Sequence, residues 1–385
     1  MITDIRLRNF KCFSDTKNLS LNKINIFTGY NGAGKSSIFQ SFLLIAQSID
    51  NNELLGIRAN GKYVGLGHVD DLIKYGSKDR QFSVSFKTDN DAYKSLYFQF
   101  KPDAKNGRIG KLIGLTVNGI NQFATSESLG GAIGEKVPLA EKEKAPEKSL
   151  QCADWSFLNL FRNIHYLSAN RYGPTLYEVR NEVDHENPLG ERGEHCLEVL
   201  KSHPEISDFI NEAINYIMNV PAPVILGDKD ESGSVLSLSF GSNECSRVKS
   251  VNTGFGFSYI LPLLLAAELG RNGKIFIENP EAHLHPQAQS RLIQVLADKT
   301  KDKNNQLFIE THSEHVINGL RLACLLPEEA NKARVDDVCI YFFEQEGKIT
   351  KLEIDEDAQL YPWPDGFFDQ QQKDSSEILK RGLLR

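Results

Sequence analysis

The chain has 385 residues, of which 40% are hydrophobic and 25% charged, a composition ordinary for a globular protein. This composition excludes a mainly disordered chain, a collagen-like chain and a disulfide-rich mini-protein. With 44 Lys and Arg against 51 Asp and Glu, the formal net charge is −7, so bulk charge does not favour a general polyanion binder.

The sequence gives no sign of membrane insertion or export. No stretch reaches the ~18–20 apolar residues that a membrane span needs, and the longest candidate, 259–269, contains Pro262 and Glu268. Residues 1–13 lack the apolar core of a signal peptide. The six cysteines are scattered, with no Cys-x-x-Cys pair. We therefore expect a cytoplasmic protein with reduced thiols and no zinc ribbon.

Hydrophobic spacing predicts the elements in chain order. It predicts strands at 2–7, 24–28, 82–86, 96–100, 113–117, 164–168 and 235–238, and helices at 35–49, 196–200 and 206–218. A stretch rich in Gly, Lys and Glu at 130–148 predicts a surface loop. The last third alternates strands at 274–277, 306–309 and 337–343 with helices at 287–296 and 314–325. This series predicts a parallel sheet in an α/β core.

A phosphate-binding loop is predicted between the second strand and the first helix. The residues Gly29-Tyr30-Asn31-Gly32-Ala33-Gly34-Lys35-Ser36 match G-x-x-x-x-G-K-[ST] without a mismatch. Glycines let backbone N–H groups turn toward phosphate oxygens, and the helix N-terminus adds its positive dipole end. We expect ATP to be bound, with Lys35 at the β- and γ-phosphates and the Ser36 hydroxyl on Mg²⁺. The expected ATP-binding residues of the loop are Gly29, Asn31, Gly32, Ala33, Gly34, Lys35, Ser36 and Ser37.

Three further segments carry chemistry. The strand at 274–277 leads into Glu278-Asn279-Pro280-Glu281 and then His283-Leu284-His285-Pro286. The next strand leads into Glu310-Thr311-His312-Ser313. Upstream, Thr253-Gly254-Phe255-Gly256-Phe257-Ser258 opens an apolar helix, which is another potential anion site. An acidic residue at a strand tip can hold Mg²⁺ beside a phosphate loop.

The order of these motifs resembles the ABC-type ATPase heads, and within them the RecF/SMC/OLD-like branch, as does the opening Asn9-Phe10-Lys11-Cys12-Phe13. The segments Glu278–Pro286, Glu310–His315 and Trp363-Pro364-Asp365-Gly366-Phe367-Phe368-Asp369 are similar to a prokaryotic group of small OLD-like AAA/ABC ATPases. The resemblance covers residues 1–50 and 250–370 well and the middle only loosely, for example at 167–171.

The resemblance implies an α/β fold. An ABC-type ATPase head would have a mixed central sheet, an antiparallel β lobe, a helical insert and here a C-terminal Trp-Pro-Asp-Gly-Phe-Phe extension. The expected boundaries are 1–165 for the N-terminal ATPase lobe, 166–250 for a helical and β insert, 251–345 for the C-terminal ATPase lobe and 346–385 for the extension.

The resemblance also implies roles for individual residues. Glu278 would be the acidic residue of the metal site and His312 the switch histidine that senses the γ-phosphate. Gly254, Gly256 and Ser258 would form the signature segment that caps ATP in the partner subunit, so a homodimer that sandwiches two ATP molecules is expected.

Asn279 departs from the family pattern, because most ABC ATPases have a catalytic glutamate there. An amide can position water but cannot take its proton. We therefore expect slow hydrolysis, or a base supplied by Glu281 or Glu310.

The expected function is an ATP-dependent switch or motor that acts with a separate effector, such as a nuclease, in phage defence or DNA maintenance, with DNA as a candidate partner. The residues after His312 are too few for a nuclease domain of the Toprim type. The alternative is a scaffold that sequesters a toxin-like partner without significant hydrolysis. A transporter subunit is disfavoured because the usual Leu-Ser-Gly-Gly signature is missing.

Other residues leave alternatives open. Arg171 fits either a nucleotide or DNA contact or a pair with a core carboxylate. The aromatic residues Trp363, Phe367 and Phe368 favour a plug packed on the sheet over a base-stacking surface. A transition-metal cluster is a disfavoured reading of His283, His285, His312 and His315. The candidate basic pairs for DNA are Arg247 with Lys249 and Arg58 with Lys62.

Overall fold

The computed structural model describes residues 1–50, 56–122, 156–176, 178–179, 188–219, 224–228, 235–241, 248–325 and 333–383. The expected loop at 130–148 and Arg247 lie outside these residues. The chain divides into two compact units, formed by residues 1–20 with 40–161 and by residues 21–39 with 162–385. Within the described ranges, no helix is long and apolar enough to cross a membrane. The four cysteines that are described, Cys12, Cys196, Cys324 and Cys339, are free thiols.

The first unit is built on an eight-stranded antiparallel sheet with the order β2-β1-β6-β7-β8-β5, to which β3 adds at β1 and β9 at β8. Alternating apolar residues bury one face, as Phe82, Val84 and Phe86 do along β6. This sheet is the expected antiparallel β lobe. Its strands are β1 (Ile2–Phe10), β2 (Phe13–Asp15), β3 (Leu19–Ser20), β5 (Gly56–Arg58), β6 (Phe82–Thr88), β7 (Ser95–Pro102), β8 (Ile109–Val117) and β9 (Ile120–Asn121).

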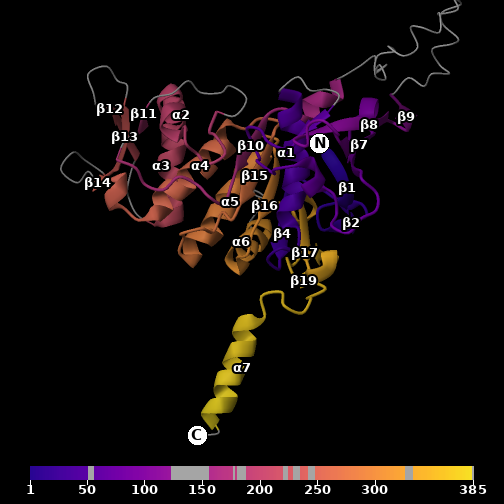
Figure 1. The fold of residues 1–385 in the computed structure, drawn as a ribbon. Helices are drawn as coiled ribbons and strands as arrows, with labels where there is room; N and C mark the ends of the chain where they lie inside the picture. The colour runs from indigo at the N-terminus through magenta and orange to yellow at the C-terminus, as the bar shows by residue number, and fades with distance from the viewer. Residues whose placement is uncertain are drawn as a thin grey trace, which may run out of the picture. The chain divides into compact units, whose positions relative to one another are not determined.

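The second unit contains a seven-stranded mixed sheet with the order β10-β15-β16-β4-β17-β18-β19. The first five strands are parallel, and β18 and β19 are antiparallel to their neighbours. The predicted β-α-β-α-β series is therefore confirmed as a parallel core (Figure 1). The strands are β4 (Ile24–Gly29), β10 (Ile164–Leu167), β15 (Lys274–Glu278), β16 (Gln306–Glu310), β17 (Val338–Phe343), β18 (Ile349–Ile354) and β19 (Leu360–Tyr361).

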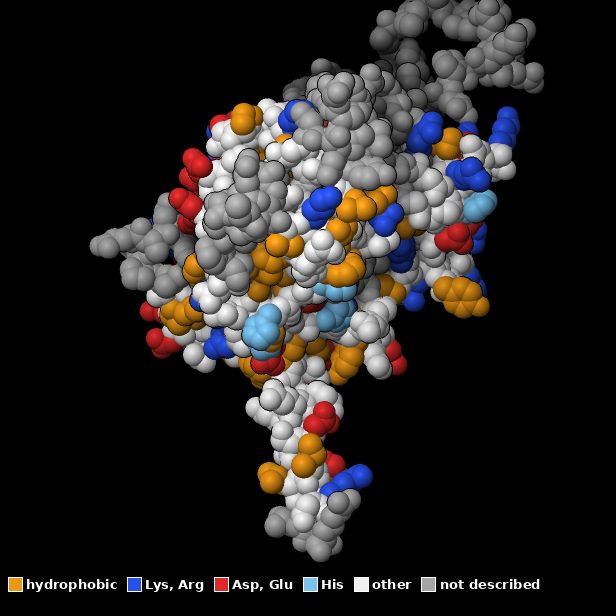
Figure 2. Space-filling model, turned by 90° about the vertical axis from the view of Figure 1, so that its left-hand side faces the viewer, with side chains coloured by type: hydrophobic (Ala, Val, Ile, Leu, Met, Phe, Trp, Pro, Cys, Tyr) orange, Lys and Arg blue, Asp and Glu red, His pale blue; other side chains and the backbone are white. Residues whose placement is uncertain are grey.

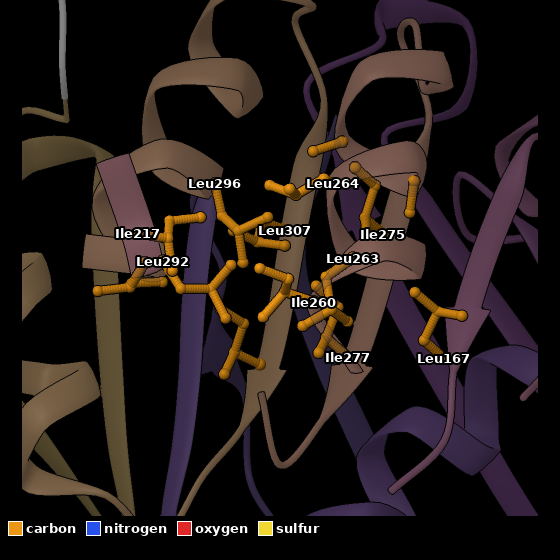
Figure 3. Close-up of a cluster of buried hydrophobic side chains, with 14 of the residues drawn as sticks. Leu167, Ile217, Ile260, Leu263, Leu264, Ile275, Ile277, Leu292, Leu296 and Leu307 are labelled. Atoms are coloured by element: carbon orange, nitrogen blue, oxygen red, sulfur yellow. The ribbon is translucent and has the colours of Figure 1, made fainter. Parts of the chain in front are cut away.

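Helices α4 (Phe255–Leu269), α5 (Pro286–Asp302) and α6 (Glu314–Leu325) connect these strands. Helix α4 is apolar on nearly all sides, and most of its residues are buried, as such a pattern requires. Figure 3 shows Leu263 and Leu264 of this helix beside Ile275 and Ile277 of β15 and Leu307 of β16. This apolar layer fixes the sheet, and with it the strand ends that carry the polar motifs.

The segment 166–250 contains both helices and strands. Helices α2 (Cys196–Ser202) and α3 (Ser207–Met218) accompany a small antiparallel sheet in which β13 (Val235–Phe240) pairs with three partners. The partners are β11 (Glu178–Val179), β12 (Val224–Asp228) and β14 (Val248–Lys249). Ile217 of α3 packs in the same apolar cluster as α4 and α5 (Figure 3).

Helix α7 (Gln370–Leu383) follows β19 near the C-terminus (yellow in Figure 1). Figure 2 shows hydrophobic side chains on this helix, at the bottom of the view, among acidic and basic ones. Ile378 and Leu379 are 70% and 67% exposed. The helix therefore contributes little to the core.

The observed division differs from the expected boundaries. Residues 21–39, with β4 and the phosphate loop, group with residues 162–385 and not with the N-terminal lobe. The reason is that β4 pairs with β16 and β17, which follow it by about 300 residues in the sequence. Helix α1 (Lys35–Asp50) begins in the second unit and continues into the first.

Candidate functional site

The phosphate loop has the predicted strand–loop–helix arrangement. Strand β4 ends at Gly29 and helix α1 begins at Lys35. Gly29, Gly32 and Gly34 have φ values of 128°, 73° and 101°, which favour glycine. A side chain at Gly29 would lie 2.6 Å from the backbone nitrogen of Phe343 on β17, so this position also has no space for a larger residue. Asn31 and Gly32 are exposed at the tip, and Ala33 and Ser37 are buried.

Lys35 lies inside this loop. It is only 3% exposed, and its Nζ donates hydrogen bonds to the carbonyl oxygens of Gly29 (3.1 Å) and Tyr30 (2.8 Å). Burial lowers the pKa of Lys35, while the charges of Glu310 and Glu281 act in the opposite direction. The ammonium group thus lies where the loop turns and where two carboxylates are near.

The two acidic strand ends are adjacent. Strands β15 and β16 are parallel and in register, so that Glu278 is opposite Glu310, and Glu310 is in turn opposite Phe27 of β4. Strand β16 therefore separates Glu278 from the strand that leads into the phosphate loop. The carboxylate of Glu278 accepts hydrogen bonds from the Tyr166 hydroxyl of β10 (3.1 Å) and the Ala169 backbone N–H (3.2 Å).

Glu310 has a different environment. It is 7% exposed and lies close enough to the Ser36 side chain for that group to lower its pKa, and its Oε2 atom has no hydrogen-bond partner among the described residues. The pKa of Glu310 is raised to about 7, mainly by burial and also by the carboxylates of Glu278 and Glu281, while Ser36 and Lys35 act to lower it. An uncompensated carboxyl group thus lies beside the first turn of α1.

Glu281 is held between the two strand ends. Its Oε2 accepts a hydrogen bond from the Thr311 hydroxyl (2.8 Å) and its Oε1 accepts one from the His312 backbone N–H (2.8 Å). The Asn279 side-chain amide lies 3.4 Å from the same Oε1. Asn279 itself adopts a positive φ of 45° and donates its backbone N–H to the Glu310 carbonyl oxygen (2.8 Å). The turn after β15 therefore aims Glu281, and not Asn279, at the end of β16.

Arg171 stabilises the turn after β15 through hydrogen bonds to backbone carbonyl oxygens. It is 2% exposed and donates to the carbonyl oxygens of Ser168 (3.0 Å), Glu278 (2.7 Å) and Asn279 (2.6 Å). Its guanidinium also lies 5.3 Å from the centre of the Tyr259 ring, and burial lowers its pKa to about 10. These carbonyl contacts differ from both alternatives that the sequence left open. The spacing of residues in the sequence does not indicate these contacts, because β10 and β15 become neighbours only in the folded sheet.

The glycine-rich segment begins helix α4. Gly254 is its exposed N-cap residue and Phe255 is 51% exposed, stacked on the His283 ring at 5.1 Å. Gly256 is buried, and a side chain there would lie 3.1 Å from the Met218 side chain and 3.4 Å from the His283 carbonyl oxygen. The Ser258 hydroxyl is also buried, and it has no hydrogen-bond partner among the residues that the structure describes. The fold therefore places this glycine-rich segment next to His283, which follows the acidic end of β15.

The four histidines have separate contacts. The Nδ1 of His285 accepts the Gln287 backbone N–H (3.3 Å) and caps α5, and the His315 backbone N–H donates to Ser313. Desolvation and the charge of Lys35 lower the pKa of His312. Nowhere in the described part of the chain are three or more His, Cys, Asp or Glu placed to hold a metal ion. The disfavoured transition-metal reading thus gains no support.

The C-terminal aromatic segment contacts the phosphate loop. Phe367 is 1% exposed and packs against Phe342 of β17 at 5.4 Å, and Phe342 packs against Tyr30 at 5.7 Å. Trp363 covers Phe367 at 4.7 Å and is 54% exposed. Gly366 has a φ of 83°, and a side chain there would collide with the Tyr30 hydroxyl. The expected plug on the sheet is confirmed for Phe367.

Three families match parts of the chain. Residues 4–172 match a family described as AAA domain, and residues 176–317 match one described as AAA ATPase domain. Residues 334–378, which include the aromatic segment, match a family described as protein of unknown function (DUF3696).

Among individual proteins, an ATP/GTP phosphatase of Helicobacter pylori is 22% identical over 82% of this chain and 86% of its own length. The DNA double-strand break repair Rad50 ATPase of Sulfolobus acidocaldarius is 34% identical, but the match spans 24% of this chain and only 9% of that protein. An SMC head bound to the C-winged helix domain of ScpA superposes with a TM-score of 0.53 at 13% identity, covering 92% of this chain and 98% of the other.

A second SMC head, with an extended coiled coil and bound to a ScpA domain from Pyrococcus furiosus, gives a TM-score of 0.50 at 12% identity over 98% of this chain and 99% of the other. The chain therefore has the α/β fold of SMC heads, with a mixed and an antiparallel sheet. Each of the two AAA models covers less than half of the chain, so these matches show a similarity of its parts to ATPase domains.

Proposed function

We propose that this protein binds Mg²⁺-ATP at the phosphate loop, hydrolyses it slowly, and works as an ATP-dependent dimeric switch of the OLD/RecF-like type with a separate effector. The observation that carries the proposal is the position of Lys35. Its buried ammonium group lies on the loop carbonyls of Gly29 and Tyr30, within the electrostatic reach of Glu281 and Glu310. Triphosphate oxygens would replace those carbonyls as its partners, and Mg²⁺ on Ser36 would offset the added negative charge.

Glu281 is the residue that we propose for water activation. A general base must be a proton acceptor held in a fixed position, and the Asn279 amide cannot accept a proton. The two hydrogen bonds from Thr311 and His312 orient the Glu281 carboxylate. Glu281→Gln should keep the shape of the group and lower ATP turnover about 100-fold or more, with nucleotide affinity retained. Equal turnover in Glu281→Gln and the wild type would exclude this role.

Dimerisation through ATP is the second part of the proposal. Gly254 and Phe255 are exposed at the N-terminus of α4, so a second copy can approach the backbone N–H groups there. Gly254, Gly256 and Ser258 would then form the segment that caps the partner's nucleotide. An enclosed ATP that is hydrolysed slowly would keep the dimer closed until an effector responds.

The biological setting is the third part of the proposal. We propose a nuclease or toxin-like protein as the effector, in phage defence or DNA maintenance, in the cytoplasm. The match to a DNA double-strand break repair ATPase supports a DNA-linked role. The alternative of a scaffold that sequesters its partner without significant hydrolysis is favoured by one observation, the amide of Asn279 at the end of β15.

The test measures ATP turnover and oligomer mass on the same purified sample, with and without Mg²⁺-ATP. The variants are Lys35→Ala and, as a matched control, Lys348→Ala, whose lysine pairs with Glu344 on the surface. We expect slow turnover and ATP-dependent dimers that only Lys35→Ala abolishes. Dimers without turnover would favour the scaffold. Rapid turnover from a monomer would contradict the switch, and unchanged ATP binding in Lys35→Ala would exclude the site itself.

A further inference from the structure

Glu310 occupies a position that the phosphate-loop motif does not explain. It ends β16, the strand next to β4, and lies opposite Phe27, two residues before the loop begins at Gly29. The residue is 7% exposed, and its Oε2 has no hydrogen-bond partner within the described ranges. Burying a carboxylate oxygen without a partner is costly. Lys35 supplies a nearby positive charge but no hydrogen bond to this oxygen, so the arrangement points to a further cation as its partner.

The other acidic strand end is already occupied. Both oxygens of Glu278 accept hydrogen bonds, one from the Tyr166 hydroxyl and one from the Ala169 N–H. These donors belong to β10 and to the residues after it, on the side of β15 away from β16. These two contacts orient the Glu278 carboxylate toward β10 and the residues after it. Glu310, at the end of the strand next to β4, lies near the Ser36 side chain.

We propose that Glu310, with the hydroxyl of Ser36, binds the Mg²⁺ that accompanies ATP, and that Glu278 instead fixes the end of β10. This inference rests on the ATP binding proposed above. The donors fit the ion, because Mg²⁺ prefers hard oxygen ligands and is usually held by one or two carboxylates together with phosphate oxygens and water. The bound ion neutralises charge on the phosphates.

Acid–base catalysis is the competing role for Glu310. The surroundings of Glu310 and Glu281 indicate different roles for the two carboxylates. Glu310 lies near Ser36, whose hydroxyl a phosphate loop offers to Mg²⁺, and its Oε2 has no partner among the described residues, whereas Glu281 is held by Thr311 and His312. A ligand affects nucleotide affinity only when Mg²⁺ is present. A general base affects ATP turnover and leaves the Mg²⁺ dependence of nucleotide affinity unchanged.

The experiment measures the affinity of a non-hydrolysable ATP analogue, AMP-PNP, by calorimetry, once with saturating Mg²⁺ and once with EDTA. The variants are Glu310→Gln, Glu310→Asp and Glu278→Gln, with Glu314→Gln on the neighbouring helix α6 as a control. We expect Mg²⁺ to tighten binding in the wild type and the control. Glu310→Gln should lose about 10-fold or more of that gain, the size expected when a group at a metal site is removed. Its affinity in EDTA should stay unchanged, and Glu310→Asp should recover part of the gain.

A second readout follows the metal directly. Mn²⁺ added with AMP-PNP should give the electron paramagnetic resonance signal of a protein-bound ion in the wild type and in Glu278→Gln, and should give less of it in Glu310→Gln. The inference is overturned if Glu278→Gln, and not Glu310→Gln, loses the Mg²⁺ dependence. It is also overturned if Glu310→Gln lowers turnover alone. Failure of the wild type to bind AMP-PNP under either condition would instead refute the proposed function.

Discussion

Replacing Glu310 by Gln should change how the stability of the metal-free protein depends on pH. The folded chain raises the pKa of this carboxyl to about 7 from its ordinary value of 4.5, mainly through burial. Between these two values the folded state binds more protons at Glu310 than the unfolded state does. The wild type therefore loses stability as the pH rises from about 4.5 to 7, and the full cost remains above pH 7.

The size of the effect follows from the two pKa values. Each tenfold difference in proton affinity is worth about 1.4 kcal/mol, so ionised Glu310 costs roughly 3 kcal/mol at pH 8 and about 1 kcal/mol at pH 5. Glutamine does not titrate, so the variant escapes this cost. Its amide adds a donor to a buried site, but that penalty is the same at both pH values. The stability of Glu310→Gln relative to the wild type should thus increase by roughly 2–3 kcal/mol between pH 5 and pH 8.

Urea unfolding followed by circular dichroism, in EDTA and without nucleotide, measures the stability of both proteins at pH 5 and at pH 8. The tested quantity is the change in their stability difference between the two pH values. The comparison removes the contribution of the other titrating groups, because Lys35, Glu278 and Glu281 face the site in both proteins. Glu314→Gln controls for the loss of one negative charge. A stability difference that is the same at pH 5 and pH 8 would refute the claim that Glu310 is an uncompensated buried carboxyl.

Two other substitutions test how the site is supported. Phe367→Ala removes a ring that is 1% exposed and packs on Phe342, so it should lower the free energy of unfolding by about 3–5 kcal/mol in urea melts. Because Phe342 also contacts Tyr30 of the phosphate loop, the ATP affinity of Phe367→Ala should fall more than that of the exposed-site variant Ile378→Ala. Equal ATP affinities of the two variants would contradict this link. Arg171→Lys keeps the positive charge but loses the planar guanidinium group, so it should lower ATP turnover and reduce the free energy of unfolding by about 2–3 kcal/mol. Wild-type ATP turnover in this variant would show that the three carbonyl contacts do not position the turn after β15.

Local sequence signals were sufficient for the elements that carry the site. The phosphate loop was predicted because glycines with positive φ, a preceding apolar strand and a following helix are all encoded within about 20 neighbouring residues. The apolar strands β15 and β16 and the helix α5 between them were also predicted correctly, since strands buried on both faces have a continuous hydrophobic pattern. The plug formed by Phe367 followed from its aromatic neighbours.

Strand order is what the sequence did not encode locally. The pairing of β4 with β16 and β17 joins segments about 300 residues apart, and it moved the phosphate loop out of the expected lobe 1–165. The same pairing decides which carboxylate lies at Ser36. Glu278 and Glu310 both end apolar strands in the sequence, and only the position of β16 between β15 and β4 distinguishes them.

The sequence by itself determined that a nucleotide-type loop, acidic strand ends and a glycine-rich helix start occur in one α/β chain. The tertiary structure alone decided their contacts: Glu281 on Thr311 and His312, Arg171 on the carbonyls of the turn, and Glu310 beside Ser36. The physical reason is that backbone conformation depends on neighbours in the chain, whereas the partner of a buried polar group depends on which strands lie side by side.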